Sequence, residues 1–121
     1  MRIFKTRWFA KYALRSGIDD TALAEAVERA ENGLIDANLG GGVIKQRIAR
    51  AGGGKSGGYR TVILYRSSDK SFFVYGFAKN ERANISRSEL MDFRDLADEF
   101  LNLDAASIAE ALNEGAIEEV R

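Results

Sequence analysis

The fold follows from residues 59–66, which read Tyr-Arg-Thr-Val-Ile-Leu-Tyr-Arg. This segment is rich in β-branched and aromatic residues, and its middle, Val62-Ile63-Leu64, is apolar without alternation. Such a run is typical of a strand that is buried on both faces. The sequence therefore predicts a central strand over residues 59–66.

A strand is predicted on each side of the central one. Residues 43–50 alternate, so that Lys45 and Arg47 share one face while Ile44 and Ile48 share the other. A tight turn at residues 67–70 leads into a third strand over residues 72–78, whose aromatic residues are expected to share one face: Phe73, Tyr75 and Phe77. The short links favour an antiparallel meander of three strands.

Helices are predicted on both sides of this meander in sequence. A strand over residues 2–5 precedes a helix that is capped by Thr6 and ended by Gly17. A second helix begins at Asp19 or Asp20 and ends at residues 32–33. Residues 39–42 are expected to be a flexible segment leading into the sheet.

The C-terminal part is predicted to be helical. Ser86 and Glu89 have the spacing of a capping box, and Asp104 can cap a last short helix. Residues 117–121 are expected to be loosely held. Together these elements predict one α+β domain over residues 1–121, with residues 86–121 as a helical, acidic C-terminal extension.

Charge is distributed unevenly although the formal net charge is zero. Residues 43–82 contain nine basic and two acidic residues, whereas the last 39 residues contain ten acids and three arginines. A basic face on a small domain is typical of proteins that bind nucleic acid. From this stretch we expect contacts with RNA or the ribosome at Arg50, Lys55, Tyr59 and Arg66, with Tyr59 able to stack on a base.

The composition excludes several kinds of site. The chain has neither cysteine nor histidine, which removes thiol nucleophiles, thiolate metal sites and the commonest general acid–base group. We therefore expect no metal and no cofactor. The sequence contains neither an apolar signal-peptide core nor a segment that resembles a membrane span, so a cytoplasmic location and no membrane partner are predicted.

The glycine-rich loop at residues 51–58 does not match a phosphate-binding P-loop. Ala49 stands where the first glycine of that motif belongs, and the loop leads into a strand instead of a helix. Two interpretations stay open. The loop is either a long hairpin with Lys55 at its tip, or its backbone N–H groups bind a phosphate of RNA.

A joint pattern resembles the RelE/HigB group of bacterial toxins. It consists of Lys45-x-Arg47, the Gly58-Tyr59-Arg60 element and the segment from Tyr75 to Arg82. The predicted order of strands and helices fits the same group over nearly the whole chain. With its long acidic C-terminus, the chain looks most like the HigB-like branch.

This resemblance implies the toxin of a type II toxin–antitoxin system and a metal-independent endoribonuclease that cuts mRNA in the ribosomal A site. It implies three partners: the ribosome, mRNA and a cognate antitoxin, which we expect to be of the helix-turn-helix type. The implied catalytic residues are Lys45, Arg47, Arg60, Lys79 and Arg82. Asn80 and Ser86 stand where the RelE pattern has an arginine and a tyrosine.

Two other functions are compatible with the sequence. A ParE-like toxin has the same fold but inhibits another target such as DNA gyrase, and a non-catalytic RNA-binding regulator needs only the basic face. Growth arrest on expression would separate toxins from the regulator. Cut mRNA would separate a nuclease from a gyrase inhibitor.

Overall fold

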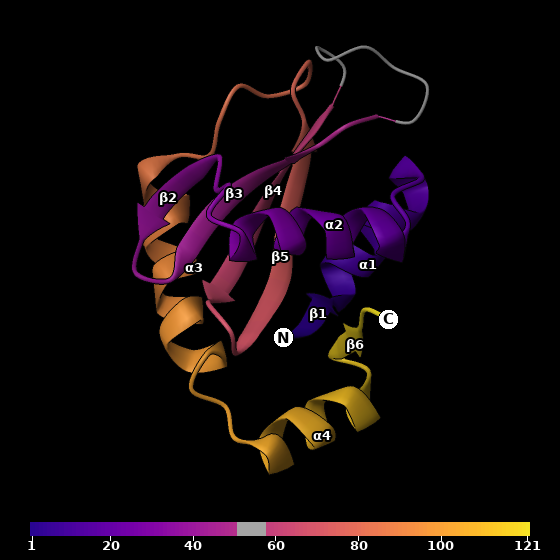
Figure 1. Cartoon of the computed structure of the whole chain (residues 1–121), viewed down its shortest axis with the longest axis vertical. Coiled ribbons are helices and arrows are strands. Elements are labelled where there is room, and N and C mark those ends of the chain that lie inside the picture. Colours follow the sequence, from indigo (N-terminus) through magenta and orange to yellow (C-terminus); the bar gives the residue numbers. More distant parts are fainter. Residues whose placement is uncertain (51–57) are drawn as a thin grey trace.

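The computed structural model describes residues 1–50 and 58–121, and in this part of the chain one mixed sheet is surrounded by helices (Figure 1). The strand order is β2-β3-β4-β5-β1-β6. The strands are β1 (Arg2–Thr6), β2 (Ala37–Gly40), β3 (Val43–Ile48), β4 (Tyr59–Arg66), β5 (Lys70–Ala78) and β6 (Ile117–Glu119). β1 runs parallel to β5, and the other pairs are antiparallel.

The helices are α1 (Arg7–Ser16), α2 (Asp20–Glu31), α3 (Arg87–Phe100) and α4 (Ala105–Glu114). Their ends confirm the predicted caps. The Thr6 hydroxyl accepts from the Phe9 N–H, and Gly17 ends α1 in a left-handed conformation with φ of 72°. Asp19 caps α2, and Ser86 and Glu89 form both hydrogen bonds of a capping box at the start of α3.

The central meander is confirmed. β4 pairs with β3 on one side and with β5 on the other, and Val62, Ile63 and Leu64 are fully buried. Two cross-strand rows lie on one face of the sheet: Lys45 beside Val62 beside Tyr75, and Arg47 beside Arg60 beside Phe77. These rows place the basic residues of two strands next to one another.

Two strands were not predicted. Residues 37–40 form β2, which pairs with β3, so the expected flexible segment is wrong in its first half. Residues 117–119 form β6, which pairs with β1, and both Ile117 and Val120 are buried. The expectation of a loosely held C-terminus is therefore wrong, because a short apolar face at residues 117 and 120 completes the sheet beside β1.

A β-bulge in β5 changes the expected face of its aromatic residues. Val62 pairs with Tyr75 while Ile63 pairs with Phe73, which leaves Val74 as the extra residue. Because a bulge shifts the alternation by one residue, Phe73 packs in the cluster with α1, whereas Tyr75 packs against the cluster on the α3 side. The prediction that Phe73, Tyr75 and Phe77 share one face is wrong.

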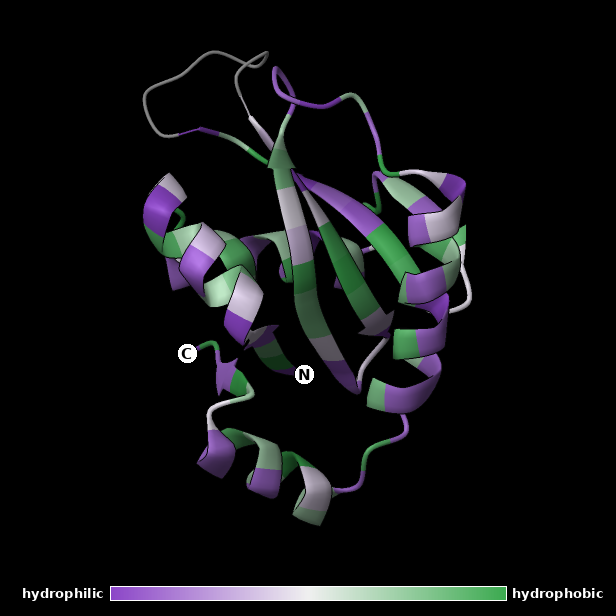
Figure 2. Ribbon diagram, turned by 180° about the vertical axis from the view of Figure 1, so that it is seen from behind, coloured by the Kyte–Doolittle hydropathy of each residue, from purple (hydrophilic) through white to green (hydrophobic). Residues whose placement is uncertain are grey.

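The helices cover opposite faces of the sheet (Figures 1 and 2). α1 and α2 pack on one face around Phe9, Leu23 and Ile63. α3 and α4 pack on the other around Phe4, Leu64 and Phe72. None of the helices among the described residues is long and apolar enough to span a membrane.

Candidate functional site

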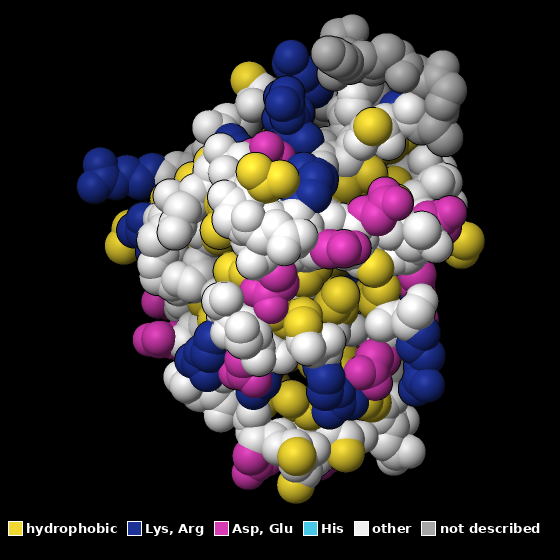
Figure 3. All heavy atoms as spheres, viewed as in Figure 1, with side chains coloured by type: hydrophobic (Ala, Val, Ile, Leu, Met, Phe, Trp, Pro, Cys, Tyr) yellow, Lys and Arg dark blue, Asp and Glu magenta, His cyan; other side chains and the backbone are white. Residues whose placement is uncertain are grey.

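Lys45, Arg47 and Arg60 lie together on the face of the sheet that also carries α3, and we call these three residues the basic cluster. Arg47 and Arg60 are direct cross-strand neighbours, and Lys45 lies in the adjacent row. All three line a hollow of about 290 Å³, together with Asp36 and Ala37. Figure 3 shows Lys and Arg side chains gathered over the upper part of the sheet.

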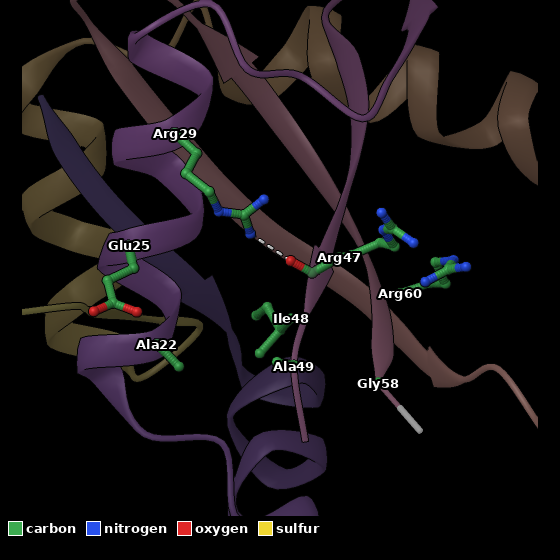
Figure 4. A pocket seen from close by; sticks show the side chains of 8 residues that line it. All are labelled: Ala22, Glu25, Arg29, Arg47, Ile48, Ala49, Gly58 and Arg60. Carbon is green, nitrogen blue, oxygen red and sulfur yellow. Dashed lines mark hydrogen bonds between the residues drawn. The ribbon is translucent and has the colours of Figure 1, made fainter. Parts of the chain in front are cut away.

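The guanidinium groups of the basic cluster are available for a ligand. Within residues 1–50 and 58–121, the side chains of Arg47 and Arg60 make no hydrogen bond and no ion pair. Their repulsion is therefore not neutralised by an acidic partner, and like charges directly opposite one another destabilise a sheet. In Figure 4 both side chains point away from β3 and β4 in the same direction. Such a pair is suited to binding an anion with two forked groups.

The backbone of Arg47 is held by two side chains at the edge of β3. Its N–H donates to Asp36 Oδ2 at 2.6 Å, and its carbonyl accepts from Arg29 of α2 (Figure 4). Arg29 and Asp36 also form an ion pair of 3.8 Å. Both free backbone groups of this edge residue are thus occupied, which fixes the direction of its side chain and blocks pairing by another strand.

The buried side-chain amide of Gln46 helps to hold these residues in place. Gln46 is fully buried, and its Nε2 donates to the carbonyl oxygens of Ala26 and Leu34 at 3.0 and 3.1 Å. Its Oε1 accepts from the Asp36 N–H at 2.7 Å. Gln46 therefore ties α2 and the segment before β2 to β3, and so positions Asp36 beside Arg47.

A larger hollow of about 480 Å³ continues over the edge of β3 towards α2. Arg47 and Arg60 form part of its wall, and the opposite wall comes from α2, with Ala22, Glu25 and Arg29 (Figure 4). Arg47 and Arg60 thus border both hollows.

Arg82 borders the basic cluster and is part of an ion pair. Its guanidinium lies 5.8 Å from the centre of the Phe77 ring, which is in the same row as Arg47 and Arg60. It binds both carboxylate oxygens of Glu89 on α3, and it donates to the Tyr75 hydroxyl at 3.0 Å. Its guanidinium also lies 5.7 Å from the centre of the Tyr75 ring, and this ring stacks on Trp8 at 5.0 Å. Arg82 therefore fastens the segment after β5 to α3, and most of its donors are occupied.

This ion pair makes the stability of the fold depend on pH. The Arg82 guanidinium lowers the pKa of Glu89 from 4.5 to about 2. A carboxyl group with a lowered pKa stabilises the fold above its ordinary pKa, and this contribution is lost as the pH falls through the lowered value.

We therefore expect Glu89→Gln to lower the free energy of unfolding at pH 7, because glutamine keeps the capping position but not the charge. The difference from the wild type should shrink between about pH 4.5 and pH 2 and vanish below it. Urea unfolding across this range measures it. Glu99→Gln in the same helix is the control, and a difference that stays constant with pH would refute the prediction.

The other predicted catalytic residue, Lys79, follows the end of β5. Its backbone N–H donates to the Gly58 carbonyl at 3.4 Å, which places it beside the start of β4, and its side chain is exposed. The structure thus brings three of the five predicted catalytic residues into one cluster. Lys79 lies at the end of the neighbouring strand, and Arg82 lies beside the cluster, connected to Lys45 through Asn84 and paired with Glu89.

The predicted RNA-binding residues are scattered. Tyr59 is buried, and its hydroxyl donates to the Ser16 carbonyl at 3.1 Å, which argues against base stacking by this ring. Arg50 lies over the Tyr59 ring on the α1 side. Arg66, at the far end of β4, donates to the Leu101 carbonyl at 2.6 Å at the end of α3. Lys55 lies outside the described residues.

Sequence reasoning missed four residues that shape the site: Arg29, Asp36, Gln46 and Asn84. Asn84 accepts a hydrogen bond from Lys45 Nζ at 3.1 Å, although 39 residues separate the two in sequence. These residues bind partners on other elements, so neither periodicity nor a local motif indicates them. The one local signal was the polar Gln46 within an otherwise apolar face with Ile44 and Ile48.

One protein family matches this sequence, and its description is RelE toxin of the RelE/RelB toxin–antitoxin system. The match covers residues 1–120. No curated protein matches the chain. The match concerns the family as a whole, so assignment to the HigB-like branch stays a prediction.

Proposed function

Since the chain belongs to the RelE toxin family, and so is the toxin of a toxin–antitoxin system, we propose that it cleaves mRNA on the ribosome. Its partner within the system is an antitoxin. As part of the proposal, residues 1–121 act as one domain and the antitoxin is of the helix-turn-helix type.

One observation carries the proposal. Arg47 and Arg60 lie directly opposite each other across two strands, and neither side chain has an acidic partner among the described residues. Two unneutralised cations at this spacing cost stability unless an anion binds between them. The phosphate of an RNA backbone supplies that anion, and the forked guanidinium groups match its oxygens.

The proposed reaction is a transesterification at one phosphodiester of the RNA backbone. The 2′-oxygen attacks the adjacent phosphorus, the bond from phosphorus to the 5′-oxygen breaks, and the products are a 2′,3′-cyclic phosphate and a 5′-hydroxyl. The amine of Lys45 takes the proton of the 2′-hydroxyl, and the leaving 5′-oxygen takes a proton from water. Arg47 and Arg60 stabilise the additional negative charge that develops on the phosphoryl oxygens.

The ribosome supplies what this open site lacks. The hollow beside the basic cluster is open to solvent, and besides the cluster itself only Asp36 and Ala37 line it. An isolated RNA strand would therefore be held in many orientations, whereas cleavage needs the 2′-oxygen in line with the leaving oxygen. An mRNA already held by the ribosome meets this requirement.

The test is cleavage of a defined mRNA by the purified protein, with and without stalled ribosomes, followed by mapping of the new 5′ ends. We expect cuts at the codon in the A site only when ribosomes are present, with 5′-hydroxyl ends. Inhibition of DNA supercoiling by gyrase in a parallel assay, with intact mRNA, would contradict the proposal and favour the ParE-like alternative.

A further inference from the structure

The segment between β5 and α3 is organised around Asn84. Arg82 Nε donates to the Asn84 carbonyl at 2.7 Å, and Arg82 itself is held by Glu89 of α3. The Asn84 side-chain oxygen accepts from the Ile85 N–H at 2.9 Å. The side chain of Asn84 is thus fixed from within its own segment.

The same Asn84 oxygen accepts from Lys45 Nζ at 3.1 Å. Across the residues described here, Nζ makes no other hydrogen bond. An amide oxygen accepts from an amine as well as from an ammonium group and carries no net charge. Asn84 therefore fixes the Lys45 nitrogen in place without the preference for its cationic form that a carboxylate would add.

The charged groups around Lys45 come from several elements. Arg47 lies on the same strand and Arg60 on β4, and Asp36 precedes β2; all three line the hollow with Lys45. Asp36 is already bound to the Arg47 N–H and paired with Arg29. From β5 and the segment that follows it, Tyr75 lies in the same row as Lys45, and Arg82 is paired with Glu89.

From this geometry we propose that Asn84 is the positioning residue of Lys45, directing its nitrogen at the 2′-hydroxyl that it deprotonates. The inference rests on the proposed function and deepens it, because it says which group acts as the base and what holds it. When one N–H of the Lys45 amine donates to Asn84, the lone pair of its nitrogen is free to face the hollow that Arg47 and Arg60 line.

The experiment changes the charge of this one contact. Asn84→Asp keeps an acceptor for Lys45 and Ile85 in a side chain of the same shape, but it adds a negative charge next to Nζ. Asn113→Asp is the matched control, because it makes the same change at an exposed position of α4 that forms no hydrogen bond with Lys45. Ribosome-dependent cleavage of mRNA is measured under single-turnover conditions across pH.

The cleavage rate of the wild type should rise with pH. For Asn84→Asp we expect the same rise about one pH unit higher, and a rate at pH 7 about tenfold lower than that of the wild type. Asn84→Ala should lower the maximal rate without changing the pH at which the rate rises, because alanine removes the hydrogen bond that orients Lys45 but adds no charge. Asn113→Asp should follow the wild-type profile. Circular dichroism and ribosome co-sedimentation confirm that each variant is folded and bound.

The outcomes separate this inference from the proposed function. If the wild type cuts mRNA and Asn84→Asp has the same profile as Asn113→Asp, the positioning role of Asn84 is refuted while the nuclease stands. If the wild type leaves ribosome-bound mRNA intact, the proposed function is refuted, and the role of Lys45 as a base is refuted with it.

Discussion

Arg60→Ala is expected to lower the rate of mRNA cleavage by about a hundredfold or more while the protein stays folded. Arg60 is one of the two guanidinium groups that the proposed mechanism places on the phosphoryl oxygens, and removing one donor to such a developing charge typically costs this much. The fold should survive, because Arg60 faces Arg47 across the strands and removing one cation relieves their repulsion.

Two further variants make this test specific. Arg60→Lys should recover part of the activity, because lysine keeps the charge but lacks the planar fork. Arg15→Ala is the control, because Arg15 is exposed on α1, which packs on the face of the sheet opposite the basic cluster. Mapped mRNA ends give the rate and circular dichroism gives the fold. A folded Arg60→Ala protein that cuts at the wild-type rate would remove Arg60 from the site.

Gln46→Leu is expected to lower the free energy of unfolding by about 3 kcal/mol, the largest effect on stability that we predict. Leucine fills a similar volume, so the loss comes from hydrogen bonding. The carbonyl of Leu34 and the N–H of Asp36 lose their partner, and each unsatisfied group costs about 1–3 kcal/mol.

The control for Gln46→Leu is Arg47→Leu, the same new side chain one residue further along β3 on the exposed face. Its effect on stability should be small, since Asp36 and Arg29 bind only the backbone of Arg47. Urea unfolding of both variants measures the difference. Equal stabilities for the two variants would show that the buried amide contributes little.

The meander could be predicted because its signals are local. Val62-Ile63-Leu64 indicates a buried strand, and the capping pairs Thr6 with Phe9 and Ser86 with Glu89 define helix starts within four residues of sequence. β2 and β6 were not predicted, because both are short and their residues do not indicate a strand by composition. β2 is stabilised by pairing with β3, and β6 by pairing with β1. The bulge at Val74 is set by the partner strand, so alternation along β5 alone pointed to the wrong face for Phe73.

The same distinction holds for the candidate site. Lys45, Arg47 and Arg60 were predicted to lie together because a period of two residues and an antiparallel pairing are enough to align them. The ion pair of Arg82 with Glu89 and the hydrogen bond of the Tyr59 hydroxyl to the Ser16 carbonyl were not predicted. No pattern within a single element indicates those contacts, because they depend on how α1 and α3 pack.

The pairing of β6 with β1 has a consequence for biosynthesis. β1 is made before β6, so during translation the outer edge of β1 has no neighbour until Ile117–Glu119 has left the ribosomal exit tunnel. An unpaired edge strand readily associates with other chains, and premature termination before residue 117 would leave it permanently open. The nascent toxin therefore reaches its edge-protected form only after residues 117–119 have left the ribosome.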